Sequence, residues 1–145
     1  MYQRILLAYD GSPTGQNALL DCKDLAHWAQ SELALVAVLP NQIGLVATES
    51  GVFDSGLMEQ EKAAMQAVLD EGVARLAAAG HRTTGTLLLG DTVDEIARHA
   101  KEIEADLIVV GHRHLDNWAA RWWSGSVSKA LIAHSPCSVL VVITQ

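Results

Sequence analysis

Five short runs of apolar residues recur along the chain, separated by longer segments in which apolar positions repeat with helical spacing. The runs are continuous rather than alternating, which is typical of strands buried on both faces of a parallel sheet. We expect strands at residues 5–9, 33–39, 83–89, 107–110 and 138–143, and helices at about 13–30, 57–79, 92–104 and 125–134. This alternation predicts one α/β domain over residues 1–145, an open five-stranded parallel sheet with helices on both faces.

Local signals mark several of the helix ends. Ser12 and Pro13 fit an N-cap and a first helical residue, and Gly80 fits a helix C-terminus. Thr92 and Glu95 fit a capping box, with the threonine as N-cap. Residues 41–55, rich in glycine and small polar residues, are expected to form a long surface loop, either a lid or a plain excursion.

Net charge and hydropathy limit which partners the protein can bind and where in the cell it is expected. The 145 residues carry a formal net charge of −7, which argues against a general nucleic-acid binder because that function needs a basic face. A polyanionic ligand would have to be held by local donors. No apolar run reaches the length of a membrane helix, and the N-terminal residues are too short and strand-like for a signal peptide. We expect a cytoplasmic protein without a membrane partner.

Side chains capable of metal or redox chemistry are sparse. The two cysteines, Cys22 and Cys137, are expected to be buried free thiols. His112 and His114 form a His-x-His pair, but they follow a strand end and no third ligand is evident, so no metal site is predicted.

The residues that could bind a ligand lie at the carboxyl ends of the predicted strands. In open parallel sheets the ligand crevice lies at the carboxyl ends of the strands, where the strand order reverses. With the common order 3-2-1-4-5, Asp10 and Gly111 would face each other across that crevice. Gly125 and Ser126 open a helix downstream, and helix N-termini present unpaired N–H groups to anions. We therefore expect the segment from Asp106 to Val142 to bind the phosphates of a nucleotide.

Five motifs together resemble the universal stress protein family over the whole length of the chain. The motifs are ILLAYDGS (5–12), VAVLP (36–40), GDTVDEIARHA (90–100), DLIVVGHR (106–113) and GSVSKALIAHSPCSVLVV (125–142). The resemblance implies a Rossmann-like fold, a homodimer and, in one branch of the family, ATP binding.

The glycine motif of the ATP-binding branch is altered in this chain. That motif reads Gly, two residues, Gly, nine residues, Gly, then Ser or Thr. Gly111 matches the first glycine, but His114 stands at the second and ten residues separate it from Gly125. Either the loop is one residue longer and Gly125-Ser126 is the pair, which we prefer, or Ser124-Gly125 replaces it in reversed order. A β-carbon at 114 opposes positive φ or close backbone approach by about 1 kcal/mol.

The resemblance also implies roles for individual residues in ATP binding. Asp10 would contact the ribose or adenine side, and Ala8 and Val38 would line the adenine pocket. Val110 and Gly111 would flank the phosphates. The phosphate oxygens would accept hydrogen bonds from Gly125, Ser126 and Val127, with Arg113 and Lys129 offsetting some of the negative charge. Mg²⁺ would travel with the nucleotide, held mainly by phosphates and water.

Two further features suggest partners. The strand at 138–143 would lie at a sheet edge without charge or proline, and such an edge invites pairing with another chain, which predicts a homodimer. Trp118, Trp122 and Trp123 fit three readings: a cover over the nucleotide loop, a partner interface, or a local cluster on the sheet edge.

Three functions remain to be separated. The first is a regulatory nucleotide-binding stress protein with little or no catalysis, in which ATP shifts the loop between Gly111 and Gly125 and alters binding of an unidentified protein partner. The second is an interaction homodimer of the same fold that binds no ATP. The third is an enzyme that hydrolyses ATP slowly or transfers a phosphoryl group. The chain has no GxxxxGK[ST] loop, so rapid phosphoryl transfer has no obvious source.

Overall fold

A computed structural model describes residues 2–9, 11, 13–21, 30–39, 55–113 and 125–144. Its elements are β1 (Arg4–Tyr9), α1 (Pro13–Leu20), β2 (Glu32–Leu39), α3 (Ser55–Ala78), β3 (Arg82–Leu89), α4 (Thr92–Glu102), β4 (Leu107–Arg113), α6 (Gly125–His134) and β5 (Ser138–Thr144). The cap expected at Ser12, the helix beyond residue 21, Cys22, the loop at 41–54 and the three tryptophans at 118, 122 and 123 lie outside the described residues.

The five strands form one parallel sheet in the order β3-β2-β1-β4-β5. This confirms the expected sheet and strand order. Strand β1 is central: Leu6 lies opposite Ala34 of β2 on one side and opposite Ile108 of β4 on the other. Because the chain leaves β1 toward β2 and later returns to the other side of β1 as β4, the order reverses between these two strands.

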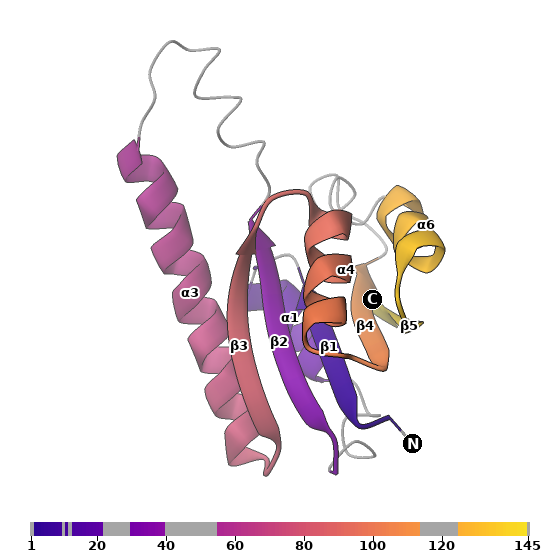
Figure 1. The fold of residues 1–145 in the computed structure, drawn as a ribbon. Coiled ribbons are helices and arrows are strands. Elements are labelled where there is room, and N and C mark those ends of the chain that lie inside the picture. The colour runs from indigo at the N-terminus through magenta and orange to yellow at the C-terminus, as the bar shows by residue number, and fades with distance from the viewer. Residues whose placement is uncertain are drawn as a thin grey trace.

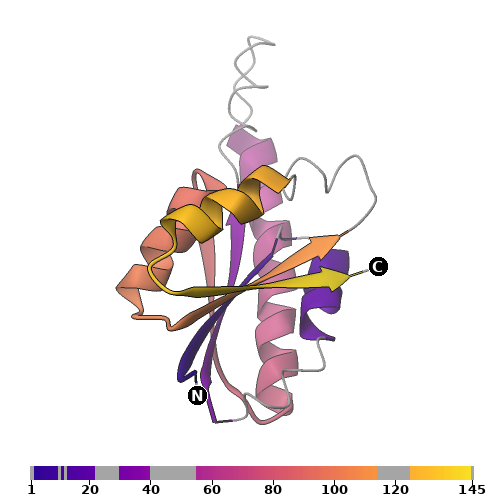
Figure 2. The ribbon, with the colours of Figure 1, turned by 90° about the vertical axis from the view of Figure 1, so that its right-hand side faces the viewer.

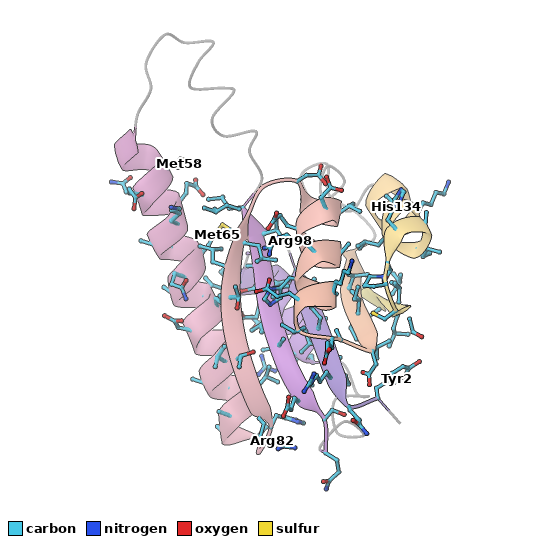
Figure 3. The ribbon with its side chains drawn as sticks, viewed as in Figure 1. Tyr2, Met58, Met65, Arg82, Arg98 and His134 are labelled. Atoms are coloured by element: carbon cyan, nitrogen blue, oxygen red, sulfur yellow. The ribbon has the colours of Figure 1, made fainter. Side chains whose placement is uncertain are left out.

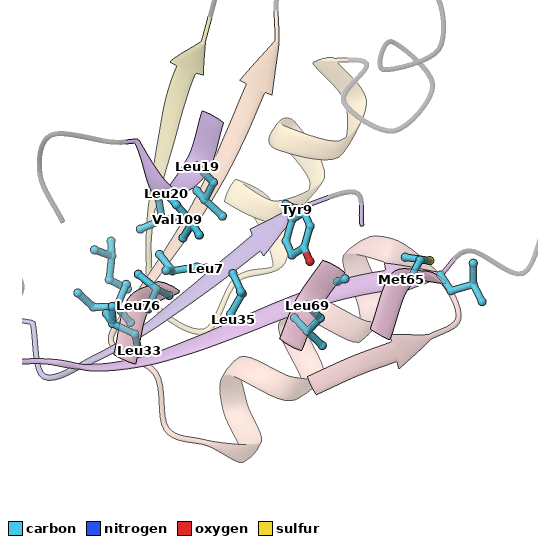
Figure 4. Packing of buried hydrophobic residues seen from close by; sticks show 14 residues of the cluster. Leu7, Tyr9, Leu19, Leu20, Leu33, Leu35, Met65, Leu69, Leu76 and Val109 are labelled. Atoms are coloured by element: carbon cyan, nitrogen blue, oxygen red, sulfur yellow. The ribbon is translucent and has the colours of Figure 1, made fainter. Parts of the chain in front are cut away.

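Helices cover both faces of the sheet (Figures 1 and 2). Alternate residues of the strands point to opposite faces, so each face has its own apolar cluster. One cluster includes Leu7, Tyr9 and Leu35 of the sheet with Leu19 of α1 and Leu69 of α3 (Figure 4). The other joins the second face of the same strands to α4 and α6, with these members: Leu6, Ala8, Val36, Val38, Leu88, Ile96, Ala100, Ala105, Ile108, Val110 and Leu131.

Helix α3 ends as its sequence indicates. Gly80 has a φ of +94°, and the N–H groups of Gly80 and His81 donate to the carbonyls of Ala77 and Leu76 over 3.0 and 3.1 Å. These two bonds form a Schellman motif, which needs a left-handed residue that glycine supplies without a steric penalty. The expected end at Gly80 is thereby confirmed.

Helix α4 corrects the predicted capping box. The N-cap is Asp91, whose carboxylate accepts a hydrogen bond of 3.0 Å from the N–H of Asp94. Thr92 is the first helical residue, so the prediction of Thr92 as N-cap was wrong by one position. Aspartate is the better N-cap here because its carboxylate accepts from the N–H of Asp94, the third residue of the helix. It also carries a negative charge at the positive end of the helix dipole.

Strand β4 is longer than expected. The sequence placed its end at Val110, with a loop from Gly111 onward. In the structure Gly111, His112 and Arg113 continue the strand and lie opposite Val142, Ile143 and Thr144 of β5. The added pairing partner explains the extension, because the backbone groups of these polar residues find hydrogen bonds along β5 that the sequence pattern does not reveal.

Candidate nucleotide site

The site expected from the sequence lies at the carboxyl ends of β1 and β4. The last paired residues of these two strands are Ala8 and Val110. Beyond this pair β4 continues for three residues, from Gly111 to Arg113, with β5 as its partner. Within the described residues, the edge of these three that faces away from β5 has no pairing strand. The topological switch point therefore presents β4 backbone groups toward the ligand side of the sheet.

Three predicted apolar site residues share one face of the sheet. Ala8, Val38 and Val110 all belong to the core beneath α4 and α6, and the side chain of each has no exposed surface. Their side chains serve core packing in this structure. Each whole residue has no exposed surface, so neither the side chain nor the backbone at these three positions offers surface to a ligand in this structure.

The first turn of α6 holds the predicted phosphate ligands. Gly125 is the first residue of the ten-residue helix, and Ser126 and Val127 follow in the same turn. The helix connects back to β4, so its N-terminus lies at the carboxyl edge of the sheet, as Figure 1 shows. Unpaired N–H groups and the helix dipole both favour an anion at such a terminus.

The charged members of the predicted set are placed only in part. Asp10 and His114 lie outside the described residues, and Gly111 and Arg113 are placed through their backbone in β4. Lys129 is exposed on α6, one turn from the first helical residue. Within the part of the chain that is described, no three His, Cys, Asp or Glu side chains gather as a metal site would require.

The turn that leaves β1 contains a contact that the sequence did not reveal. Gly11 has a φ of +83° and is buried. A β-carbon at Gly11 would overlap the terminal methyl group of Met65, which comes from α3 and is itself buried. The Asp-Gly pair after a strand signals the turn, but Met65 lies 54 positions after Gly11 in the sequence and no pattern in the chain links the two.

Two groups with shifted pKa values lie away from the predicted ligands, His99 in α4 and Cys137 just before β5. Burial lowers the pKa of His99 in α4 below its ordinary value, against the opposing effect of Glu102. Burial raises the pKa of the Cys137 thiol, although its contact with Ser135 acts in the opposite direction. Cys137 is a half-buried free cysteine rather than the fully buried one expected, because it lies just before the edge strand β5.

The arrangement defines a class of protein: a doubly wound α/β domain with its ligand edge where β1 and β4 diverge. The sequence profile described as the universal stress protein family matches residues 1–142. A relative described as a universal stress protein of Staphylococcus saprophyticus is 33% identical over 147 residues, covering 99% of this chain and 85% of the relative. The chain belongs to the universal stress protein family.

Solved structures agree with this assignment. A protein of the universal stress protein family from Burkholderia pseudomallei is 30% identical, with a TM-score of 0.70, and the match covers 97% of this chain and 96% of that one. A universal stress protein solved in complex with cAMP is 26% identical, with a TM-score of 0.65 and coverage of 99% and 98%. In the described part of this chain, no helix has the length and apolarity to cross a bilayer.

Proposed function

We propose that this protein is a regulatory member of its family that binds an adenine nucleotide, ATP foremost, with little or no catalysis. The observation that carries the proposal is the switch point, where β4 runs three residues past its pairing with β1 at the edge that also holds the N-terminus of α6. A family member with 26% identity was solved with cAMP, which supports an adenine nucleotide as the ligand class.

In this proposal the phosphates lie at the first turn of α6. Gly125, Ser126 and Val127 donate backbone N–H groups, and the Ser126 hydroxyl adds another donor. Val110 and Gly111 flank the phosphates from β4, and Arg113 and Lys129 offset some of the negative charge. Because the net charge is −7, these local donors act against a repulsive overall field, and a magnesium ion bound with the phosphates would reduce that repulsion.

The base and ribose lie toward β1 and β2. Asp10 accepts from the ribose hydroxyls or the adenine side. The adenine ring sits beyond the ends of the strands that carry Ala8 and Val38, whose buried side chains form the floor beneath it. The flat base thus lies over an apolar floor, while the charged phosphates accept hydrogen bonds from α6, and both parts of the nucleotide bind at one edge of the sheet.

The same proposal includes a homodimer through β5, acting in the cytoplasm. Within the described chain, β5 pairs with β4 alone, and four of its apolar residues, from Val139 to Val142, are only half-buried. An uncharged edge of this kind is available for antiparallel pairing with a second copy. Nucleotide binding would then alter how the dimer meets an unidentified protein partner.

A second candidate is an interaction dimer that binds no nucleotide. His114 in place of the second motif glycine favours it. So does the complete burial of Ala8, Val38 and Val110, since no side-chain surface at these positions is open to a ligand.

Isothermal titration of ATP with Mg²⁺, then of AMP and cAMP, distinguishes the two candidates once any copurified nucleotide has been removed. Gly125→Asp places a carboxylate at the first turn of α6, where it suits the helix dipole but repels a phosphate. We expect saturable binding by the native protein and at least about tenfold weaker binding by this variant. Ala74→Glu adds the same charge at an exposed position of α3 and should bind like the native protein. No heat from any nucleotide would favour the second candidate.

A further inference from the structure

Met65 of α3 touches the turn that follows β1. Its side chain has a relative exposure of 8%, and its terminal methyl group occupies the space that a β-carbon at Gly11 would need. The sulfur and Cγ of Met65 would each lie 3.3 Å from that β-carbon. A β-carbon at Gly11 would therefore displace the end of the Met65 side chain, and the left-handed φ of +83° at Gly11 is a second reason for glycine.

Further contacts tie α1 to α3 below this point. Gln16 of α1 is buried against Gly72, where a β-carbon would overlap its side-chain amide. Arg75 donates to Asn17 over 3.2 Å and pairs with Asp21. Since Met65, Gly72 and Arg75 follow one another along α3, this helix contacts the turn and the described part of α1 along their length. Figure 3 shows Met65 on α3 near the carboxyl edge of the sheet.

Gly11 lies next to the candidate site. It follows Tyr9 by two residues, and Asp10, the proposed ribose or adenine ligand, is its immediate neighbour. The contact with Met65 holds Gly11, and with it the turn at the carboxyl end of β1, against α3. The part of the site at the end of β1 therefore depends on the contact of Met65 with Gly11, although α3 itself supplies none of the proposed ligand-binding residues.

We infer that Met65 is a positioning residue for the nucleotide site, holding the turn at Gly11 in place at the carboxyl end of β1. This inference rests on the proposed function for its consequence in binding. The contact itself stands on the packing of Met65 against Gly11. An unbranched thioether fills such an irregular gap well, and truncation to alanine would leave a cavity beside the turn.

Three variants separate positioning from general packing. Met65→Ala removes the contact, whereas Met65→Leu restores most of the volume. Leu76→Ala is the control: Leu76 lies eleven residues further along the same helix, about 16 Å away by helical rise, and is buried in the same core. Figure 4 shows Met65 and Leu76 at opposite ends of this cluster.

Two readouts are measured on each variant of the full chain. The first is the hydrogen-exchange rate and chemical shift of the Gly11 amide by NMR. We expect Met65→Ala to speed exchange at Gly11 about tenfold relative to exchange elsewhere in β1, with Met65→Leu near native. The second is the dissociation constant for ATP, which should rise about tenfold in Met65→Ala, recover in Met65→Leu and stay native in Leu76→Ala.

The amide-exchange measurement tests the Met65 contact independently of whether the protein binds a nucleotide. If the native protein binds no nucleotide, the proposed function fails, yet the exchange data still decide whether Met65 holds the turn. An unchanged Gly11 amide in Met65→Ala would overturn the inference. Equal weakening of ATP binding by Leu76→Ala would also overturn it, since loss of stability alone would then account for the effect.

Discussion

Single residues fix where several elements of this protein begin and end. Gly80 and Glu104 both occupy the left-handed position just after a helix, with φ of +94° and +56°. Glycine is the residue expected there, and the sequence signal was accordingly clear at Gly80. At Glu104 the same motif lacks a glycine and was not recognised in the sequence. The predicted helix therefore ran to residue 104, two residues beyond the observed end of α4 at Glu102.

Glu104 is a site of stored conformational strain that substitution can release. The N–H groups of Glu104 and Ala105 donate to Lys101 and Ala100 in the same pattern as at Gly80. We expect Glu104→Gly to raise the free energy of unfolding by about 1 kcal/mol relative to Glu104→Ala. Both variants lose the exposed ion pair with Arg4, so the comparison isolates the backbone term. Urea denaturation checks it, and equal stability of the two variants would contradict this reading.

Asp91 and Thr92 offer a direct test of the observed cap. Because the Asp91 carboxylate accepts from Asp94 N–H, Asp91→Ala should lower the free energy of unfolding by about 1 kcal/mol. Thr92→Ala should change it by less than about 0.5 kcal/mol. Thermal and urea denaturation of both variants measure the difference. A larger loss of unfolding free energy in Thr92→Ala than in Asp91→Ala would indicate that Thr92 is the N-cap.

His99 makes stability depend on pH. Burial lowers its pKa in the folded state below the ordinary value of 6.5, while Glu102 and Glu95 raise it less and Arg98 lowers it further. The unfolded chain therefore binds more protons than the folded protein between the two pKa values, so stability rises with pH in that window and is lost as pH falls below about 6.5.

We expect His99→Gln to be less sensitive than the native protein to acidification. The measurement is the free energy of unfolding in urea at about pH 7.5 and about pH 5.5. Other titrating groups contribute to both proteins, so the difference between the two pH slopes reports His99. Identical slopes would show that its protonation does not differ between the folded and unfolded states.

At the scale of elements, apolar runs predicted the positions of the strands, because burial on both faces leaves few polar positions. The strand order came from the order common to open sheets of this kind, and the structure has that order. The helix at 125–134 matched α6 at both ends. The end of β4 was missed for a different reason. Gly111, His112 and Arg113 look like loop residues by composition, and only pairing with β5 makes them strand. Pairing over such a distance in sequence leaves no local signal.

The candidate site was predictable to a similar degree. Its place at the switch point follows from the strand order, and the first turn of α6 follows from the Gly-Ser pair at 125–126. The burial of Ala8, Val38 and Val110 follows from strands buried on both faces, but their position beneath α4 and α6 was not predictable, because it depends on which face each helix covers. The packing of Met65 on Gly11 likewise arises only when α3 packs against β2, β3 and α1.

At the scale of the whole molecule, the two sheet edges differ in chemistry. Strand β3 carries Arg82 and three threonines, whereas the described β5 residues include an unbroken apolar run from Val139 to Ile143. We expect the purified protein to be a dimer at micromolar concentration, formed by antiparallel pairing of β5. Light scattering coupled to size exclusion measures the mass. A monomeric mass across a dilution series would contradict this expectation.

The central claim is that an adenine nucleotide binds where β1 and β4 diverge, and its location can be measured directly. A titration of ATP and Mg²⁺ followed through backbone amide signals should shift Tyr9 and Gly11, the β4 residues 110–113 and the α6 residues 125–127. The amino ends of the same strands, at Arg4 and Leu107, should stay unchanged. Shifts confined to those amino ends, or none at any nucleotide concentration, would contradict the account.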